Sequence, residues 1–142
     1  MYKLLKKYNF SFLYEGEEVV LIPSFVYNNQ TVSKAIYTPD FTFRMHGYWI
    51  IIETKGRKND SWPIREKLFK KALVDNNLQE STLFFMPRSK KDCDNLILHL
   101  LAFKANKTPI TWQPINKVAD KKQLMKKVHG TTRKKNKIVL RK

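Results

Sequence analysis

The chain has 142 residues, the size of one compact domain, and 42% of them are hydrophobic, so a packed core can form. The 13% of aromatic residues exclude a disordered polymer, and the single cysteine, Cys93, excludes an intrachain disulfide. The sequence also has no CxxC or Cys/His spacing of a zinc site. A formal net charge of +16, from 28 Lys and Arg against 12 Asp and Glu, favours a polyanionic partner, and nucleic acid is the commonest one.

The opening segment predicts a short helix rather than a targeting signal. Residues 2–8 are basic and amphipathic, and residues 1–10 lack the long apolar run of a signal peptide. No segment of the chain reaches the roughly 18 apolar residues of a membrane span. We therefore expect a cytoplasmic protein, in the host cytoplasm if a phage encodes it, with no membrane partner and no small-molecule cofactor.

Short strands are predicted next. Residues 10–14 and 18–22 are rich in strand formers and flank an EGE turn. Asn28-Asn29 is typical of a hairpin turn between residues 25–27 and a later strand. Residues 37–43 predict a strand that the chain enters through Pro39.

The most convincing strand covers residues 48–55, YWIIIETK, after a hairpin turn at 44–47. Five large apolar residues in a row predict a strand that is buried on both faces, and the abrupt change to polar residues predicts a site at its end. Gly56 ends the strand, and residues 57–61 form a basic loop.

A helix should follow, capped by Asp60 or Ser61, with Pro63 in its first turn and Asn76-Asn77 at its end. Its apolar residues recur at helical spacing at Ile64, Leu68, Ala72 and Leu73.

The remaining elements complete an α/β pattern. A strand is predicted at 82–86, a helix at 91–104 and a last short strand at 110–112. The order of strands, helix, strand, helix and strand predicts an α/β core with a small mixed sheet flanked by helices. Residues 1–116 would form this domain.

From Lys117 the composition changes to a basic C-terminal tail. Residues 117–142 hold eleven Lys or Arg against one Asp, which is +10 of the total +16. Such a tail either follows nucleic-acid phosphates or is a solvated extension, and the sequence leaves both open.

Two acids stand where acids are unusual. Asp40 lies among apolar residues in YTPDFTF, and Glu53 ends the apolar run of the strong strand. Lys55 is two residues after Glu53, so both side chains point to the same side of a strand. If the neighbouring strand brings Asp40 beside them, the two carboxylates and the backbone carbonyl of Thr54 suit Mg²⁺ or Mn²⁺. Lys55 would then position or deprotonate a water, or neutralise developing charge. An ordinary ion pair is the alternative explanation for Glu53 and Lys55 taken alone.

The stretch YTPDFTF…YWIIIETKG resembles the PD-(D/E)xK, or restriction-endonuclease-like, nuclease superfamily, above all small phage-type endonucleases and Holliday-junction resolvases. The resemblance covers roughly residues 10–103. It implies a Mg²⁺-dependent endonuclease acting on DNA, with branched DNA as a candidate substrate, in which Asp40 and Glu53 bind metal and Lys55 assists catalysis. It also implies a homodimer and a basic helix that contacts the substrate, WPIREKLFKKAL in this chain.

Members of this superfamily usually carry a further acid on an N-terminal helix. The segment YKLLKKYN contains none, so Glu15, Glu17, Glu18 or a partner subunit would have to supply it.

Two other functions compete with the nuclease. The first is a DNA-binding, recombination or transposition subunit on the same fold with a weak or inactive site, and the second is a basic RNA- or ribosome-associated protein. Whether the chain cuts DNA or only binds it, Lys58, Arg65, Lys70 and Lys71 are expected to contact phosphates and to contribute affinity rather than sequence choice.

Overall fold

The structure is a computed structural model that describes residues 1–55 and 61–114. Within these ranges the chain forms three helices and eight strands. Three predicted parts of the chain lie outside the described residues: Gly56, residues 57–60 of the predicted basic loop at 57–61, which include Lys58, and the predicted tail at residues 117–142.

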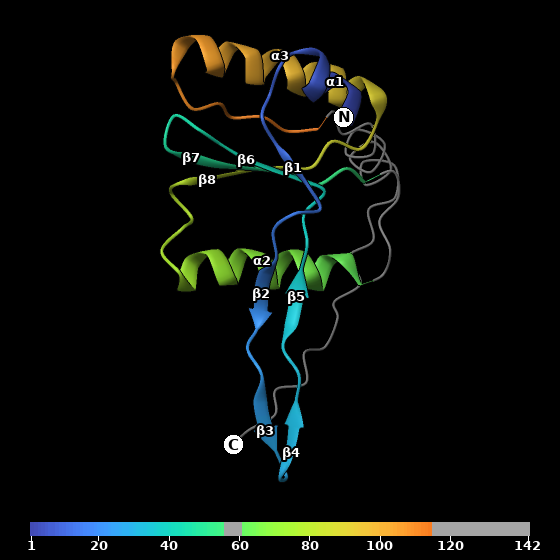
Figure 1. The fold of residues 1–142 in the computed structure, drawn as a ribbon, viewed down its shortest axis with the longest axis vertical. Coiled ribbons are helices and arrows are strands. Elements are labelled where there is room, and N and C mark those ends of the chain that lie inside the picture. Colours follow the sequence, from blue (N-terminus) through green and yellow to red (C-terminus); the bar gives the residue numbers. More distant parts are fainter. Residues whose placement is uncertain (56–60, 115–142) are drawn as a thin grey trace, which may run out of the picture.

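A four-stranded mixed sheet forms the centre of the molecule (Figure 1). Its strands lie in the order β1 (Leu13–Tyr14), β6 (Phe41–Met45), β7 (Tyr48–Ile52) and β8 (Thr82–Phe85). The pairs β1–β6 and β6–β7 are antiparallel, whereas β8 is parallel to β7. Because parallel neighbours need a crossover connection, the chain passes through α2 (Trp62–Asp75) between β7 and β8.

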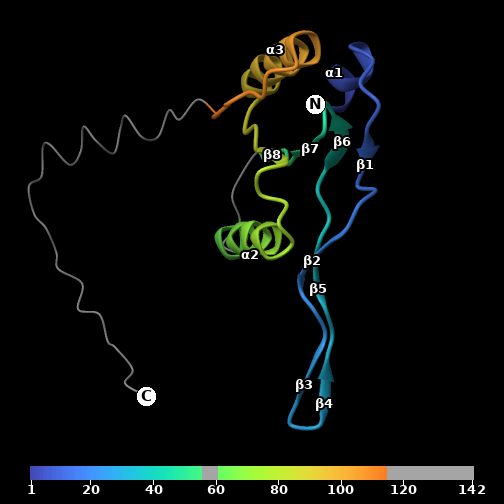
Figure 2. The ribbon, with the colours of Figure 1, turned by 90° about the vertical axis from the view of Figure 1, so that its left-hand side faces the viewer.

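Helices cover both faces of this sheet (Figures 1 and 2). The helices α1 (Tyr2–Lys7) and α3 (Lys90–Asn106) lie together on one face, and α2 lies on the other. The predicted mixed α/β core with a helix-flanked sheet is therefore confirmed. Among the described residues no helix is long and apolar enough to cross a membrane.

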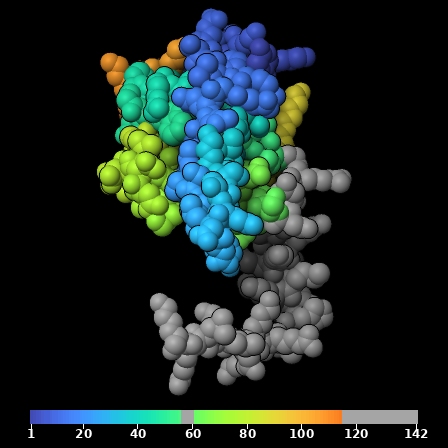
Figure 3. All heavy atoms as spheres, turned by 60° about the horizontal axis from the view of Figure 1, so that its bottom comes forward, coloured from blue at the N-terminus to red at the C-terminus, as the bar shows by residue number. Residues whose placement is uncertain are grey.

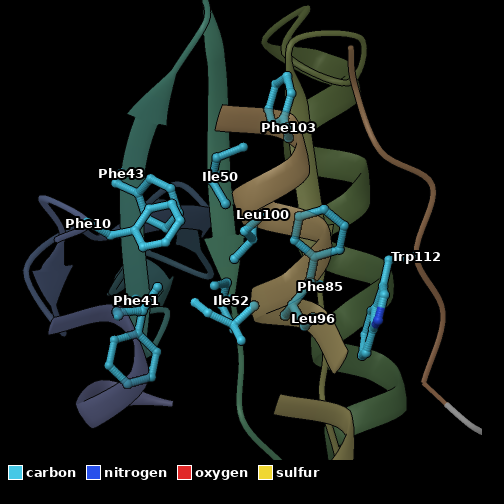
Figure 4. Packing of buried hydrophobic residues seen from close by; sticks show 12 residues of the cluster. Phe10, Phe41, Phe43, Ile50, Ile52, Phe85, Leu96, Leu100, Phe103 and Trp112 are labelled. Atoms are coloured by element: carbon cyan, nitrogen blue, oxygen red, sulfur yellow. The ribbon is translucent and has the colours of Figure 1, made fainter. Parts of the chain in front are cut away.

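The strand β7 separates two hydrophobic clusters, and its Ile50, Ile51 and Ile52 are fully buried. Ile50 and Ile52 point toward α3, as Figure 4 shows. Ile51 points the other way, into the cluster that Trp62 and Phe69 form on α2. The prediction of a strand buried on both faces is thus confirmed, and it explains why its sequence does not alternate.

A tight turn at His46-Gly47 joins β6 to β7. Both residues have positive φ, 51° and 84°, which is the backbone shape of two-residue hairpin turns that match the twist of the strands. Glycine adopts this conformation without a steric penalty. His46 is exposed, and its ring nitrogen lies 3.1 Å from the carbonyl oxygen of Lys104 on α3.

Two predicted strands near the N-terminus differ from the structure. Of residues 10–14 only β1 is a strand, and it pairs with β6, whereas the strand predicted at 18–22 is present as β2 (Val19–Ile22). The predicted strand at 37–43 is in fact two strands, β5 (Ala35–Tyr37) and β6, in different sheets. The break falls at Pro39, which is fully buried and has no N–H for a ladder.

Residues 19–37 form a long two-stranded arm (Figures 1 to 3). Its base is the pair β2–β5, which lies against α2, and its outer half is the pair of β3 (Phe25–Tyr27) and β4 (Gln30–Val32). Asn28 and Asn29 make the turn with φ of 46° and 61°, so the predicted hairpin turn is confirmed. The outer half extends beyond α2.

The helix α2 follows Ser61, has Pro63 in its first turn and ends at Asp75, just before Asn76-Asn77, as predicted. The Ser61 side chain makes no capping hydrogen bond to the helix, so the predicted cap is not formed by this side chain. Its buried face was predicted only in part. Ala72 and Leu73 are buried, but Ile64 is 62% exposed, because Trp62 and Phe69 provide the face that packs on the sheet.

The C-terminal elements are partly as predicted. The helix predicted at 91–104 is α3, and the hydroxyl of its N-cap residue, Ser89, accepts a hydrogen bond from the backbone N–H of Asp92. The predicted strand at 110–112 is wrong. Instead, Trp112 packs edge-on against Phe85 and its indole N–H donates to Asn95 Oδ1 at 2.8 Å. These side-chain contacts hold Trp112 in place without backbone pairing to a strand.

Candidate functional site

The candidate site lies where β7 ends and β6 begins. Phe41 pairs with Ile52 in the antiparallel ladder. The residues directly beyond this pair, Asp40 and Glu53, therefore lie at the same end of the β6–β7 hairpin. The structure therefore brings the two predicted acids to the same sheet end, as the sequence analysis expects.

Asp40 is held against the peptide that follows Glu53. Its Oδ2 accepts a 2.7 Å hydrogen bond from the backbone N–H of Thr54 and a second, short hydrogen bond from the Thr54 hydroxyl. On its other side, the backbone N–H of Glu15 donates to the carbonyl oxygen of Asp40 at 2.9 Å. The Asp40 side chain is half-buried and fixed in position by these contacts.

Glu53 is the most buried acid of the site, with 3% of its surface exposed. Both of its oxygens have partners: Oε2 accepts from the Tyr37 hydroxyl at 2.7 Å, and Oε1 lies 2.6 Å from Lys55 Nζ. A buried carboxylate is costly unless it is paired and hydrogen-bonded, and both conditions are met here.

Tyr37 is a site residue that the sequence analysis missed. It is buried and its ring packs edge-on against Phe69 and Trp62. Burial, followed by the hydrogen bond to Glu53 and its charge, raises the pKa of the Tyr37 hydroxyl above its ordinary range. The hydroxyl therefore remains a donor to Glu53. Its position two residues before Pro39 gives no sign of this contact.

Lys55 lies on the same side of the chain as Glu53, as predicted from their spacing. Its ammonium group is 4.6 Å from the centre of the Trp62 ring, and about a quarter of its side chain is exposed. Trp62 is 1% exposed, so its role is packing and a cation–π contact rather than base stacking from the surface.

The backbone of this segment is clamped to β8. The N–H of Glu53 donates to the carbonyl of Phe85 at 2.9 Å, and the N–H of Lys55 donates to that of Pro87 at 3.0 Å. The segment therefore continues the parallel hydrogen bonding beyond the end of β7, while the N–H of Thr54 donates to Asp40 on the other side.

Two adjoining hollows open beside the site, and both are lined by Thr54 and Cys93. The larger, of about 500 Å³, contains Asp40 and Tyr14. The smaller, of about 270 Å³, is lined by three basic residues, Lys55, Arg88 and Lys90. Asp40 thus lines the larger hollow, and the basic residues line the smaller one. Arg88 and Lys90 were missed, because their distance from Lys55 in the sequence hides their proximity.

Cys93 lines both hollows. Burial raises the pKa of its thiol, which keeps it protonated near neutral pH.

Three acids were considered as replacements for the missing helix carboxylate, and their surroundings differ. Glu17 accepts a 2.9 Å hydrogen bond from the Trp49 indole at the start of β7, and Glu18 lies 3.7 Å from Lys34 on the arm. Glu15 alone among the three adjoins Asp40, through the backbone hydrogen bond between them. Glu15 is therefore the acid of this group that is nearest to the site.

The predicted DNA-contacting residues on α2 are exposed. Lys70 lies 2.8 Å from Glu66, and Lys71 makes a close ion pair with Asp75, each one helical turn away. Exposed pairs of this kind are weak and exchange readily for other anions. Arg65 is close enough to Tyr37 for its charge to act on that hydroxyl, which puts it nearest the site of the three.

The oxygen ligands at the site are of the type that a hard divalent cation prefers, because Mg²⁺ is commonly held by one or two carboxylates and several waters. Asp40 and Glu53 supply the carboxylates, and Glu53 would have to exchange its Lys55 partner for the metal. Among the residues that the structure describes, no group of three His, Cys, Asp or Glu side chains could hold a metal. The predicted site differs from such a group, because its ligands would be two carboxylates and one backbone carbonyl.

Comparison of the chain with protein-family models finds no match, and comparisons with curated proteins and with solved structures find none either.

Replacing Tyr37 with Phe is expected to lower the free energy of unfolding by about 1–3 kcal/mol, because Glu53 Oε2 loses its donor while it stays buried. The ring and its packing are preserved, so the change isolates the hydroxyl. Urea denaturation of both proteins measures the difference. Tyr27→Phe, at an exposed position of the arm, is the matched control and should change nothing. Equal effects of the two variants would contradict the assigned role of the hydroxyl.

Proposed function

We propose that this chain is a metal-dependent endonuclease with the restriction-endonuclease-like, PD-(D/E)xK architecture, and that it hydrolyses phosphodiester bonds of DNA. The observation that carries the proposal is the pair of carboxylates at one sheet end, one of them buried and ion-paired to a lysine, in a chain with a net charge of +16. A protein that only binds DNA gains nothing from acids that repel the phosphate backbone.

In this proposal Asp40, Glu53 and the carbonyl of Thr54 would hold Mg²⁺ or Mn²⁺. When bound, the ion lowers the pKa of a coordinated water and stabilises negative charge on the phosphate. Tyr37 fixes one oxygen of Glu53 by a hydrogen bond, and Thr54 fixes one oxygen of Asp40 in the same way. Lys55 would be released from Glu53 Oε1 and would orient the water or neutralise charge on the phosphate.

The basic hollow beside Lys55 would receive the phosphates on one side of the cut. Arg88 and Lys90 lie there, at the start of α3. With Arg65 at the start of α2, and with Lys58, Lys70 and Lys71, they form the contacts that we propose for the DNA backbone. Such contacts position the duplex and do not read its sequence.

A second function is favoured by one observation. The Glu53 carboxylate has all its oxygens engaged by Tyr37 and Lys55, which is also a stable arrangement for a site that no longer binds metal. The alternative is therefore a DNA-binding subunit for recombination or transposition with a weak or inactive site.

The test is cleavage of supercoiled plasmid and of a synthetic four-way junction with Mg²⁺ or Mn²⁺. We expect cutting that stops when the ion is removed by a chelator and resumes when it is restored. Preference for the junction would identify branched DNA as the substrate. Tight binding to DNA without cutting under either ion would contradict the nuclease and support the binding subunit.

The same metal titration decides which acid assists the two carboxylates. If Glu15 contributes, Glu15→Gln raises the Mg²⁺ concentration needed for half-maximal cleavage. Glu17→Gln is the matched control, because Glu17 is engaged by Trp49. An unchanged Mg²⁺ requirement for Glu15→Gln would exclude Glu15 as the additional acid.

A further inference from the structure

Two tyrosines from different elements are open to solvent beside Asp40. Tyr2 on α1 and Tyr14 on β1 are 42% and 54% exposed, and both line the larger hollow of the site together with Asp40. Their ring centroids are 5.8 Å apart, and the ring planes are nearly perpendicular, at 82°. The two rings therefore form adjacent aromatic walls of one hollow, and the metal and phosphate contacts proposed above use neither of them.

The rings are supported from behind by the sheet. Tyr14 is the register partner of Phe41 in the β1–β6 ladder. The Phe41 ring is buried and lies 5.3 Å from the ring of Tyr14 and 6.4 Å from that of Tyr2. Phe12 packs edge-on against Tyr2 at 5.4 Å. A tyrosine has only two side-chain torsions, so a ring that is already held by its neighbours loses little entropy when a ligand stacks on it.

The hollow has the size and the lining for a flat aromatic ligand. Its volume of about 500 Å³ lies within the range of roughly 300–1,000 Å³ that is usual for small-ligand pockets. Aromatic and apolar residues make up most of its lining: Met1, Tyr2, Tyr14 and Phe41. A flat ring stacked on the face of one tyrosine meets the edge of the other, which is a favourable arrangement. A nucleobase is such a ligand, and stacking of one base on an aromatic side chain changes affinity by about tenfold.

The charges around the tyrosines suit a strand of nucleic acid. The charged residues of α1 are all lysines, Lys3, Lys6 and Lys7, and all three are exposed. Lys6 Nζ lies 4.9 Å from the centre of the Tyr2 ring. A cation beside a stacking ring suits single-stranded nucleic acid, because the phosphate is attracted while its base stacks. In a duplex the neighbouring base pairs cover the base faces, so only an unpaired or extruded base can stack on these rings.

We infer that the larger hollow binds one unpaired nucleobase of a DNA strand, stacked on Tyr2 and Tyr14, with Lys6 beside the adjoining phosphate. The binding itself requires neither metal nor cleavage. Its consequence for the reaction rests on the proposed function: because Asp40 lines the same hollow, the stacked base would belong to a nucleotide close to the bond that is cut. The preferred substrate would then carry an unpaired nucleotide at the cut, as a gap or a flap does and a fully paired four-way junction does not.

The test compares two strands of equal charge in a buffer that contains a chelator, so that no cleavage occurs. One is a strand of about ten thymidines, and the other is an abasic strand of the same length, which keeps the phosphates but has no bases. Fluorescence anisotropy measures the binding of each strand to the full chain. We expect the wild type to bind the thymidine strand about tenfold more tightly than the abasic strand.

The double variant Tyr2→Ala/Tyr14→Ala should lose this preference and bind the two strands equally, because its lysines remain. Tyr2→Phe/Tyr14→Phe keeps both rings and should bind as the wild type does. The matched control is Tyr27→Ala, which removes an exposed tyrosine of the arm that does not line the hollow. A wild type that binds both strands equally, or a double alanine variant that retains the preference, would overturn the inference.

A second measurement needs no variant. A strand that carries 5-iodouracil in place of thymine is bound to the wild type and irradiated, and mass spectrometry identifies the cross-linked peptide. We expect the cross-link at Tyr2 or Tyr14, whereas cross-links confined to other residues would overturn the inference. Base binding without cleavage under Mg²⁺ or Mn²⁺ would support this inference and contradict the nuclease, whereas cleavage without a preference for bases would do the reverse.

Discussion

Replacement of Glu53 with Gln should reduce DNA cleavage by at least about 100-fold while the protein still folds and binds DNA. Glutamine has the same shape as glutamate and can still accept the hydrogen bond from Tyr37. It cannot provide the charge that attracts a divalent ion, and it leaves Lys55 without its ion pair. Single-turnover cleavage at saturating Mg²⁺, beside a binding titration at the same salt concentration, measures both properties.

The matched control is Glu66→Gln on α2, which removes an acid whose ion-pair partner is Lys70 rather than Lys55. It should cleave at the wild-type rate. Lys55→Ala should lose activity by a similar factor while its DNA affinity changes little. If Glu53→Gln cleaves as fast as Glu66→Gln, the assignment of the site is wrong, even if the wild type is a nuclease.

The second large effect concerns stability. Phe69 is completely buried between the sheet and α2, where its ring lies 5.0 Å from the rings of both Tyr37 and Phe84. Phe69→Ala removes a large buried aromatic side chain and leaves a cavity, so the free energy of unfolding should fall by about 3–5 kcal/mol. Urea denaturation monitored by circular dichroism measures the change.

Ile64→Ala on the same helix is the control, because Ile64 is mostly exposed and its truncation should cost under about 0.5 kcal/mol. The cavity also removes support from Tyr37, which orients Glu53. We therefore expect Phe69→Ala to lose activity even under conditions in which it is still folded. A loss of stability no greater than that of Ile64→Ala would mean that α2 does not pack as described.

The parts of the fold that follow from local sequence were predictable. The run of apolar residues before Glu53 predicted a strand with two buried faces, and Asn28-Asn29 predicted the turn of the arm. The spacing of Glu53 and Lys55 predicted that they share one side, because that depends only on strand geometry. Each of these conclusions uses residues that are neighbours in the chain.

What depends on distant residues was not predictable. The strand at 37–43 was expected to be continuous, but the chain changes sheets at Pro39, and only the three-dimensional partners of β5 and β6 decide where. Trp112 was assigned to a strand because of its local composition, whereas its position depends on Phe85 and Asn95. The contact of Tyr37 with Glu53 joins two sheets and has no local signature.

The hairpin that carries Asp40 and Glu53 has a consequence for the order of folding. The two acids are thirteen residues apart in the chain and the turn between them is tight, so the loop that brings them together is short and closes within microseconds. Pairing of Ile50 with Leu83, and with it the docking of α2, spans a much longer segment and is slower. We expect the carboxylates to meet while they are still hydrated. Glu53 is then desolvated when Trp62 and β8 pack against the hairpin. We expect changes in α2 to alter the folding rate at this packing step.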